Sequence, residues 1–252
     1  DFNVNVELLN RKAFYSFGKE KGAGGMPTGV SGRVACLMSG GIDSPVAAWR
    51  LMKRGCSVVP VHFHSYPFLS RASQEKAREI CEVLTRHQMR TSLKLVPFGE
   101  LQRQVVLTVP PPMRVVIYRR LMLRIAERIA RDTRAKALVT GEVIGQVASQ
   151  TLENLTVIAD AVRMPILRPL VGMDKEEIVA EAIRIGTYDI SIIPDQDCCQ
   201  LFTPRSPETH ARHWQVAEAE SKLPIEEMVK AALGGTATEE FRFPAASETP
   251  DS

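Results

Sequence analysis

The segment Ser-Gly-Gly-Ile-Asp-Ser-Pro at residues 39–45 constrains the fold more than any other part of this sequence. It follows the short apolar run 34–38 and opens an amphipathic helical pattern that closes at Gly55. A strand, a glycine-rich turn and a helix in this order form the start of a βα unit. The same alternation continues along the chain. It predicts an α/β fold, a doubly wound parallel sheet with helices on both faces.

The later elements follow from apolar periodicity and capping residues. Asp174 and Glu177 have the spacing of a capping box, and Ser206-Pro207 reads as an N-cap followed by the first helical residue. We expect strands over 58–64, 93–98 and 137–141, and helices over 70–87, 113–132, 146–161, from 174, over 206–223 and from 224.

Three segments of the chain differ in composition. Residues 3–15 alternate as a half-buried strand does, and glycines at 22, 24 and 25 follow, so 1–29 is interpreted as the end of an earlier domain plus a linker. Because the chain opens at Asp1 inside this segment, we expect a preceding portion to be missing. Residues 30–233 form the main domain. Residues 234–252 are rich in Gly, Thr, Ser, Glu and Pro, which predicts a disordered tail.

Composition excludes some classes of protein. The longest apolar stretches, such as 58–63, contain Pro or His and fall far short of the roughly 20 residues that cross a bilayer. Five cysteines without framework spacing and the absence of a signal-like segment indicate a reducing, cytoplasmic setting. The net charge of +3 permits a nucleic-acid partner without indicating one.

The 39–45 segment has the residues of an anion cradle. Gly40 and Gly41 allow positive φ and close approach of backbone N–H groups, Ser39 and Ser44 add hydroxyl donors, and the following helix adds its dipole. Asp43 is a candidate Mg²⁺ contact, because Mg²⁺ prefers a carboxylate together with substrate phosphates. The segment is neither a Walker loop nor a dinucleotide fingerprint. The alternative is a tight turn capped by Asp43 or Ser44.

Other candidates lie at the carboxyl ends of predicted strands. His62 and His64 share one face of strand 58–64, where they are either site residues or structural histidines. No further His or Cys has ligand spacing with them, so no protein-held metal is expected. Gly141 would let a ligand approach the backbone, and Gln150 has the donor and acceptor needed to read an adenine edge. Without further information, a helix-surface residue is the preferred interpretation of Gln150.

Basic residues follow helical spacing in 113–132. This stripe could track RNA phosphates, or it is simply the solvated face of an amphipathic helix. Its members are Arg120, Arg124, Arg128 and Arg131.

Cys198 and Cys199 lie in a polar loop and are candidate sulfur-carrying nucleophiles, whereas Cys36 sits in an apolar strand and is most simply a core residue. The alternative is a pair of unreactive thiols, which the neighbouring carboxylates of Asp195 and Asp197 favour by raising the thiol pKa.

Several ordered blocks together resemble a known family. The 39–44 loop is similar to the pyrophosphate loop of the adenine nucleotide α-hydrolase-like enzymes, and the full set resembles the tRNA 4-thiouridine synthetase (tRNA sulfurtransferase) family over about residues 3–209. The blocks are Ser39–Val46, Met52–Gly55, Ala137–Glu142, Gly145–Thr151, Pro165–Pro169 and Asp197–Cys199.

This resemblance implies an ATP-dependent enzyme that adenylates the C4 carbonyl of a tRNA uridine and replaces its oxygen with persulfide sulfur. Cys199 matches the cysteine of the family's core domain, with Cys198 as the local alternative and Asp43 beside the phosphates. Residues 1–29 would end an RNA-binding (THUMP-like) domain. The ATP contacts implied are Leu37, Met38, Ser39, Gly40, Gly41, Asp43, Ser44, His62, Phe63, Arg119, Gly141 and Gln150.

The resemblance also implies Mg²⁺, a homodimer and, in some members, a role in thiamine synthesis. No rhodanese-like domain follows residue 233, which indicates the short form that takes sulfur from a cysteine desulfurase. No Cys-x-x-Cys pair occurs, which argues against an iron–sulfur cluster. Two alternatives stay open, namely another adenylating enzyme of this class (a different tRNA thiolase or an amide ligase) and an RNA-binding module without activity.

Overall fold

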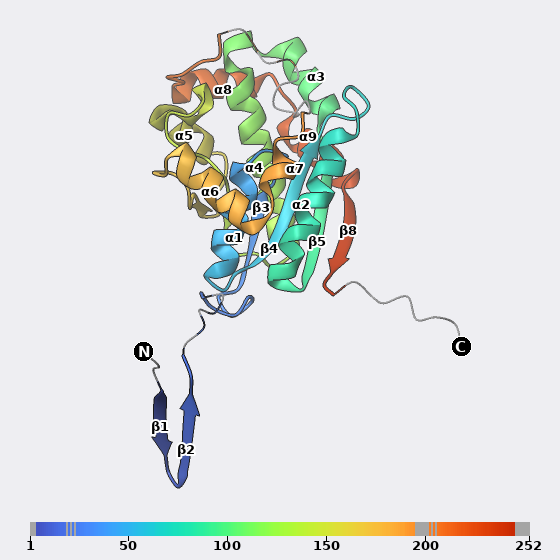
Figure 1. Ribbon diagram of the computed structural model, residues 1–252. Coiled ribbons are helices and arrows are strands. Elements are labelled where there is room, and N and C mark those ends of the chain that lie inside the picture. The colour runs from blue at the N-terminus through green and yellow to red at the C-terminus, as the bar shows by residue number, and fades with distance from the viewer. Residues whose placement is uncertain are drawn as a thin grey trace, which may run out of the picture.

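The computed structural model describes residues 4–18, 20, 22, 24–194, 202, 204 and 206–244. Its centre is a six-stranded sheet in the order β7-β6-β3-β4-β5-β8 (Figure 1). The first five of these strands are parallel, and β8 (Ala237–Arg242) pairs antiparallel with β5. The parallel strands are β3 (Arg33–Leu37), β4 (Ser57–His64), β5 (Arg90–Pro97), β6 (Leu138–Val139) and β7 (Ile166–Leu167).

Helices cover both faces of this sheet, which confirms the predicted doubly wound α/β architecture (Figure 1). Apolar side chains between the layers form two separate cores, one on each face. One face carries α1 (Asp43–Lys53), α2 (Ala72–Gln88), α6 (Lys175–Ile185) and α7 (Tyr188–Ser191). The other carries α3 (Gly99–Thr108), α4 (Arg114–Asp132), α5 (Leu152–Ala159), α8 (His213–Ser221) and α9 (Ile225–Gly234), with short 3₁₀ turns η1 (Pro111–Met113) and η2 (Ala148–Gln150).

The capping residues behave as expected at α6. The side chain of Asp174 accepts from the backbone at Glu177, and the Glu177 carboxylate accepts from the Asp174 N–H at 2.9 Å. Gly186 follows in the left-handed region and ends the helix. This confirms the predicted start of α6 and fixes its N-terminus near the 39–45 loop.

The N-terminal segment differs from its prediction. Residues 3–15 were expected to form one half-buried strand, but β1 (Asn5–Leu9) and β2 (Lys12–Ser16) form an antiparallel hairpin whose side chains are exposed. Arg11 takes a φ of 70° at the turn. In Figure 1 the hairpin projects away from the sheet.

The tail prediction is wrong for residues 237–242, which form β8 along the edge of β5. Two contacts explain why β8 is an ordered strand. Phe241 packs on the small core cluster of Cys81, Leu93 and Leu95, and Glu239 forms a two-point ion pair with Arg78 at 2.8 Å. Residues 245–252 lie outside the described part.

Two predicted helices are shorter than expected. Residues 146–161 contain only η2 and α5, because Thr151 is extended and caps α5 by accepting from the Asn154 N–H. The helix expected from Ser206 begins at His213. Side-chain bonds from Asn154 to Glu208 O and Ala211 N hold the preceding residues in a non-helical path. None of the helices in the described ranges combines the length and apolar character needed to cross a bilayer.

Candidate functional site

The candidate site lies between two neighbouring strands whose following connections go to opposite faces of the sheet. The chain leaves β3 toward α1 on one face and leaves β6 toward η2 and α5 on the other, while β3 and β6 are neighbours. In open α/β sheets this switch point, outside the carboxyl ends of the strands, is where ligands bind.

A cavity of about 220 Å³ occupies this position. Nine of the twelve predicted ATP contacts line it, although they come from four separate parts of the chain. They are Leu37, Met38, Ser39, Asp43, Ser44, Phe63, Arg119, Gly141 and Gln150. Gly40 and Gly41 lie in the turn between Ser39 and Asp43, and His62 contacts Met38, which lines the cavity.

The 39–45 loop is held by its two serines. The Ser39 N–H donates to Ser44 Oγ at 2.9 Å, and the Gly41 N–H donates to Ser39 Oγ at 3.2 Å. Gly41 does not adopt a positive φ, contrary to the expectation, and a Cβ there would meet only Ser39 Oγ at 3.5 Å. Glycine at this exposed position therefore leaves room for a ligand and is not required by the backbone itself.

Gly141 is required by close packing. A Cβ at this residue would lie 2.8 Å from Ser44 N and 2.9 Å from Asp43 C, both backbone atoms of the first turn of α1. The end of β6 and the start of α1 thus touch through Gly141. Any larger residue would displace the anion cradle.

Asp43 lines the cavity and accepts hydrogen bonds on both carboxylate oxygens. Its Oδ1 accepts from Lys175 Nζ at 2.7 Å and its Oδ2 accepts from Gln146 Nε2 at 3.1 Å. Lys175, at the start of α6, therefore places a positive charge at the 39–45 loop.

The most buried charge in the cavity wall is Glu142, with a side chain only 3% exposed. Arg119 forms an ion pair with its Oε1, and Arg168 Nε and Thr140 Oγ1 donate to its Oε2 at 2.7 and 2.9 Å. Burial alone would raise the pKa of Glu142, but the two guanidinium groups outweigh it and lower that pKa below its ordinary value. The carboxylate stays ionised and holds Arg119 at the cavity.

Glu142 was not singled out from the sequence, although it ends the Ala137–Glu142 block. Val115 and Met122 were also missed, and they line the cavity beside Arg119 from one face of α4. Their spacing of four and three residues from Arg119 is the signal that would have identified them.

Gln150 lies in η2 and is 8% exposed. Its Oε1 is buried, and no hydrogen-bond partner for it is found among the described residues. An unpaired buried amide oxygen in a cavity wall is costly unless a ligand donates to it. The prediction of a helix-surface residue at this position is wrong.

His62 supports the loop from behind. It is 1% exposed, and its Nδ1 lies 2.9 Å from Met38 O. Burial, followed by the charges of His62 and Arg78, lowers the pKa of His64 to about 4. His64 is therefore neutral at pH 7. The described residues contain no cluster of three or more side chains that could ligate a metal.

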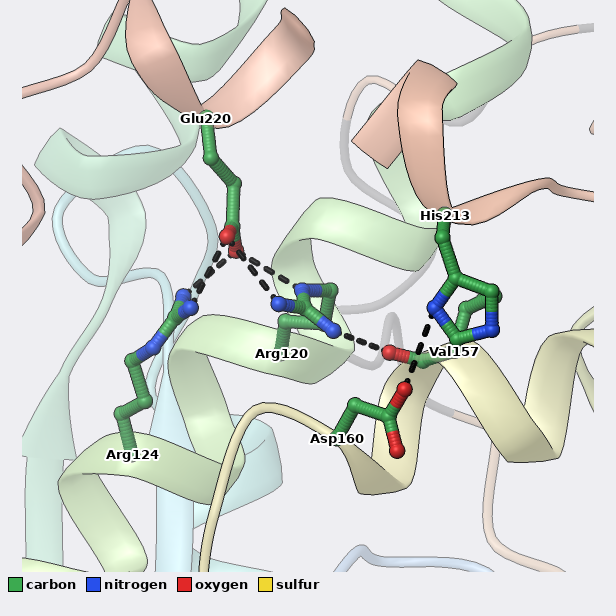
Figure 2. A network of polar contacts seen from close by, with 6 residues as sticks. All are labelled: Arg120, Arg124, Val157, Asp160, His213 and Glu220. Carbon is green, nitrogen blue, oxygen red and sulfur yellow. Dashed lines mark hydrogen bonds and ion pairs between the residues drawn. The ribbon is translucent and has the colours of Figure 1, made fainter. Parts of the chain in front are cut away.

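The predicted basic stripe is wrong as one exposed surface, because Arg120 is buried, Arg124 is half-buried and both are bound to Glu220 (Figure 2). Arg120 is 7% exposed and donates to both oxygens of Glu220 and to Val157 O. Arg124 forms a second two-point pair with Glu220. These contacts bind α8 to α4. A second tie, His213 to Asp160 at 3.1 Å, joins α8 to the end of α5.

The other two stripe members are exposed but paired. Arg128 contacts Glu226 at 3.2 Å and Arg131 contacts Glu127 at 3.1 Å.

The cysteines divide into two groups. Cys36, Cys56 and Cys81 are buried, and burial raises the pKa of each thiol, that of Cys36 to about 12. Their sulfur atoms are therefore poor nucleophiles at neutral pH. Cys198 and Cys199 lie outside the described residues, and their role stays a prediction.

Curated relatives resemble most of this chain. A probable tRNA sulfurtransferase of Thermus thermophilus is 57% identical over 228 residues, covering 90% of this chain and 56% of the relative. A probable tRNA sulfurtransferase of Brevibacillus brevis is 45% identical over 251 residues, covering the whole chain and 63% of the relative. The chain thus spans less than two thirds of each.

A solved 4-thiouridine synthetase–RNA complex with bound ATP is 41% identical, with a TM-score of 0.91 over 96% of this chain and 64% of that one. The NMN synthetase of Francisella tularensis, at 14% identity and a TM-score of 0.51 over 81% of this chain and 84% of that one, shares only the fold. The family model described as thiamine biosynthesis protein (ThiI) matches residues 29–225, and the chain belongs to that family.

Proposed function

We propose that the protein is an ATP-dependent tRNA sulfurtransferase, which converts a uridine of tRNA to 4-thiouridine. The observation that carries this proposal is the cavity at the switch point, where nine predicted ATP contacts meet and where Gln150 Oε1 has no hydrogen-bond partner among the described residues. The names of the relatives support the same reaction, since they are tRNA sulfurtransferases and a 4-thiouridine synthetase crystallised with RNA and ATP.

The site residues have distinct roles in binding ATP. Gln150 would hydrogen-bond the adenine, with Phe63, Val115 and Met122 as apolar neighbours. The N–H groups of the 39–45 loop and the start of α1 would hold the phosphates. Arg119, fixed by Glu142, would place a positive charge where the pyrophosphate leaves.

Mg²⁺ fits this site as a companion of the nucleotide. A single carboxylate, Asp43, lies at the phosphate loop, and one of its oxygens is already bound to Lys175. Magnesium is commonly held by one or two carboxylates together with substrate phosphates. It would neutralise phosphate charge when bound.

The reaction has two parts. The uracil O4 attacks the α-phosphorus of ATP, which forms an O–P bond and releases pyrophosphate. The terminal sulfur of a persulfide then attacks C4, the C4–O bond breaks and AMP leaves. A thiol next cleaves the S–S bond, leaving sulfur on C4, and an external dithiol reduces the resulting disulfide. Cys199, or otherwise Cys198, would carry or resolve the persulfide.

The partners belong to the same proposal. A cysteine desulfurase would supply the persulfide, tRNA would be bound with the help of an RNA-binding domain that ends within residues 1–29, and the protein would act as a cytoplasmic homodimer. A second product of the same sulfur chemistry, the thiazole of thiamine, is consistent with the family description.

The test is single-turnover formation of 4-thiouridine by the full-length protein, with unmodified tRNA, ATP, Mg²⁺, a cysteine desulfurase and cysteine. Cys199→Ala should release pyrophosphate from ATP and stop at adenylated tRNA, without releasing AMP or thiolating tRNA, whereas Cys198→Ala should complete both parts of the reaction. Gly41→Ala should fold normally, because its Cβ meets ordinary contacts, but lose ATP binding. Wild-type protein that binds tRNA and never forms AMP would contradict the proposal and favour a binding module.

A further inference from the structure

The amino ends of the parallel strands all meet at the sheet edge opposite the ATP cavity, and basic residues gather there. Arg33 pairs in register with Ser57, and the Lys136 N–H donates to Arg33 O at 2.8 Å. Arg90 begins β5, the neighbour of β4, and pairs with Arg242 of β8. The same end of the sheet therefore contains Lys136, Arg33, Arg90 and Arg242.

Further exposed cations flank these four residues. Arg54 lies three residues before β4, Arg134 lies four residues before β6, and Arg163 lies three residues before β7. We call the seven residues the basic edge. They are Arg33, Arg54, Arg90, Arg134, Lys136, Arg163 and Arg242. Adjacent strands lie about 4.8 Å apart, so six strands make this edge roughly 24 Å wide.

The basic edge differs from other cations of the protein in having no carboxylate partners. In the described ranges, no ion pair joins any of its seven residues to Asp or Glu. Of the nearby acids, Asp160 is paired with His213, and Glu127 is paired with Arg131 and accepts from the Arg163 N–H at 3.1 Å. In the part of the chain that the structure describes, ion pairs therefore do not balance the positive side chains of this edge.

Helix ends stabilise part of this cluster. Arg54 is the C-cap of α1, the Arg33 guanidinium donates to Thr133 O at the C-cap of α4 at 2.7 Å, and Arg90 follows the C-cap of α2. Arg90 and Arg242, however, are opposite each other on paired strands, an arrangement that is destabilising by itself. A bound anion would offset that repulsion.

We infer that the basic edge is a contact surface for the phosphate backbone of RNA. The inference rests on the proposed function, in which RNA is the substrate. The cations are spread over the ends of six strands, and the exposed aromatic Phe243 follows one of them, Arg242. Such a spread of charge suits the repeated phosphates that position a nucleic acid more than the bases that specify it. The segment before β3 and the end of β8 lie at the same end of the sheet (Figure 1).

The test compares two double variants of the full-length protein. Arg90→Gln/Arg242→Gln removes two cations of the basic edge and a like-charge pair, so folding should not suffer. Lys222→Gln/Lys230→Gln removes two exposed cations of α8 and α9 as the matched control. Equilibrium binding of unmodified tRNA is measured at salt concentrations from about 50 to about 200 mM. Binding that depends on phosphate contacts loses much of its affinity over this range.

For the edge variant, the slope of log affinity against log salt should become shallower by about 2, one for each lost phosphate contact, and affinity at the lower salt should fall about tenfold or more. ATP binding should be unchanged. An edge variant with the slope of the control would overturn the inference and leave an acidic protein as the alternative partner.

The outcome separates this inference from the proposed function. Protein that forms 4-thiouridine while the edge variant binds tRNA like the control would retain the function and lose the inference. Protein whose RNA binding depends on the basic edge but which never forms 4-thiouridine would retain the inference and lose the function.

Discussion

The two edges of the sheet place their positive charges in opposite settings. At the carboxyl edge Arg119 and Arg168 share the buried Glu142, and Lys175 is bound to Asp43. At the amino edge the cations are exposed and lack carboxylate partners in the described ranges. Burial requires a counter-charge, whereas exposure to water does not.

This difference separates two uses of arginine. A guanidinium held by a buried carboxylate has a fixed position, which a cavity needs if it is to bind one ligand in one orientation. A hydrated guanidinium on a surface has no fixed position, but it can displace counterions from a polyanion. Counting basic residues along a sequence does not distinguish the two, and the pairing in the structure does.

The largest expected effect is at the carboxyl edge. Glu142→Gln would leave Arg119 and Arg168 without their shared carboxylate in a largely buried place, so we expect a loss of about 3 kcal/mol in the free energy of unfolding. Urea denaturation followed by circular dichroism measures it.

The matched control is Glu226→Gln. This carboxylate is 79% exposed in its pair with Arg128, so its loss should cost less than about 0.5 kcal/mol. Equal effects of the two substitutions would show that burial does not determine how much these ion pairs contribute to the free energy of unfolding.

An intermediate effect is expected at Glu220, between α8 and α4. Burial opposes its ionisation, but hydrogen bonds and charges from Arg124 and Arg120 lower the pKa of Glu220 to about 2. A pKa lowered by folding contributes stability above the unfolded value, and that contribution is lost as pH falls through the folded value. The window is therefore from about pH 4.5 down to about 2.

Wild-type protein should lose about 1.5 kcal/mol more than Glu220→Gln across this window, less than the full shift implies because water reaches part of the pair. Denaturation at a series of pH values measures the difference. Glu218→Gln, on the same helix with an exposed Lys222 pair, should follow the wild-type curve. Parallel curves for wild type and Glu220→Gln would contradict the assignment.

The smallest effect is expected at the amino edge, where the substitution should stabilise the protein. Arg90→Gln should raise stability by about 0.5 kcal/mol, because it removes a cation directly opposite Arg242. Arg54→Gln removes a cation without an opposite partner and should leave the denaturation midpoint unchanged. A destabilised Arg90→Gln protein would mean that this guanidinium has a stabilising contact.

The sequence predicted local structure well where periodicity and caps agree. The strand-turn-helix unit at 34–54 and the Asp174 cap needed only neighbouring residues, and both were confirmed. The location of the cavity also followed from the order of elements, because parallel strands bring their carboxyl ends to one edge.

What the sequence could not reveal depends on contacts between distant residues. Arg120 and Glu220 are 100 positions apart, and nothing in the α4 pattern distinguishes an inward arginine from a solvated one. The non-helical path before α8 likewise depends on Asn154, more than 50 residues away. The helix Gly99–Thr108 was not predicted.

The edge strand β8 also has a consequence for handling this protein. It satisfies hydrogen-bonding groups of β5 from Arg90 to Leu95 that would otherwise face solvent, and its own sequence carries Glu239, Glu240 and Arg242. Charged residues on an outermost strand discourage further strands from adding to it. A chain trimmed after Gly234, where composition suggested that the fold ends, would expose the hydrogen-bonding edge of β5 from Arg90 to Leu95, with Arg90 and Lys94 as its charged side chains. Trimmed preparations of this kind should self-associate through β5.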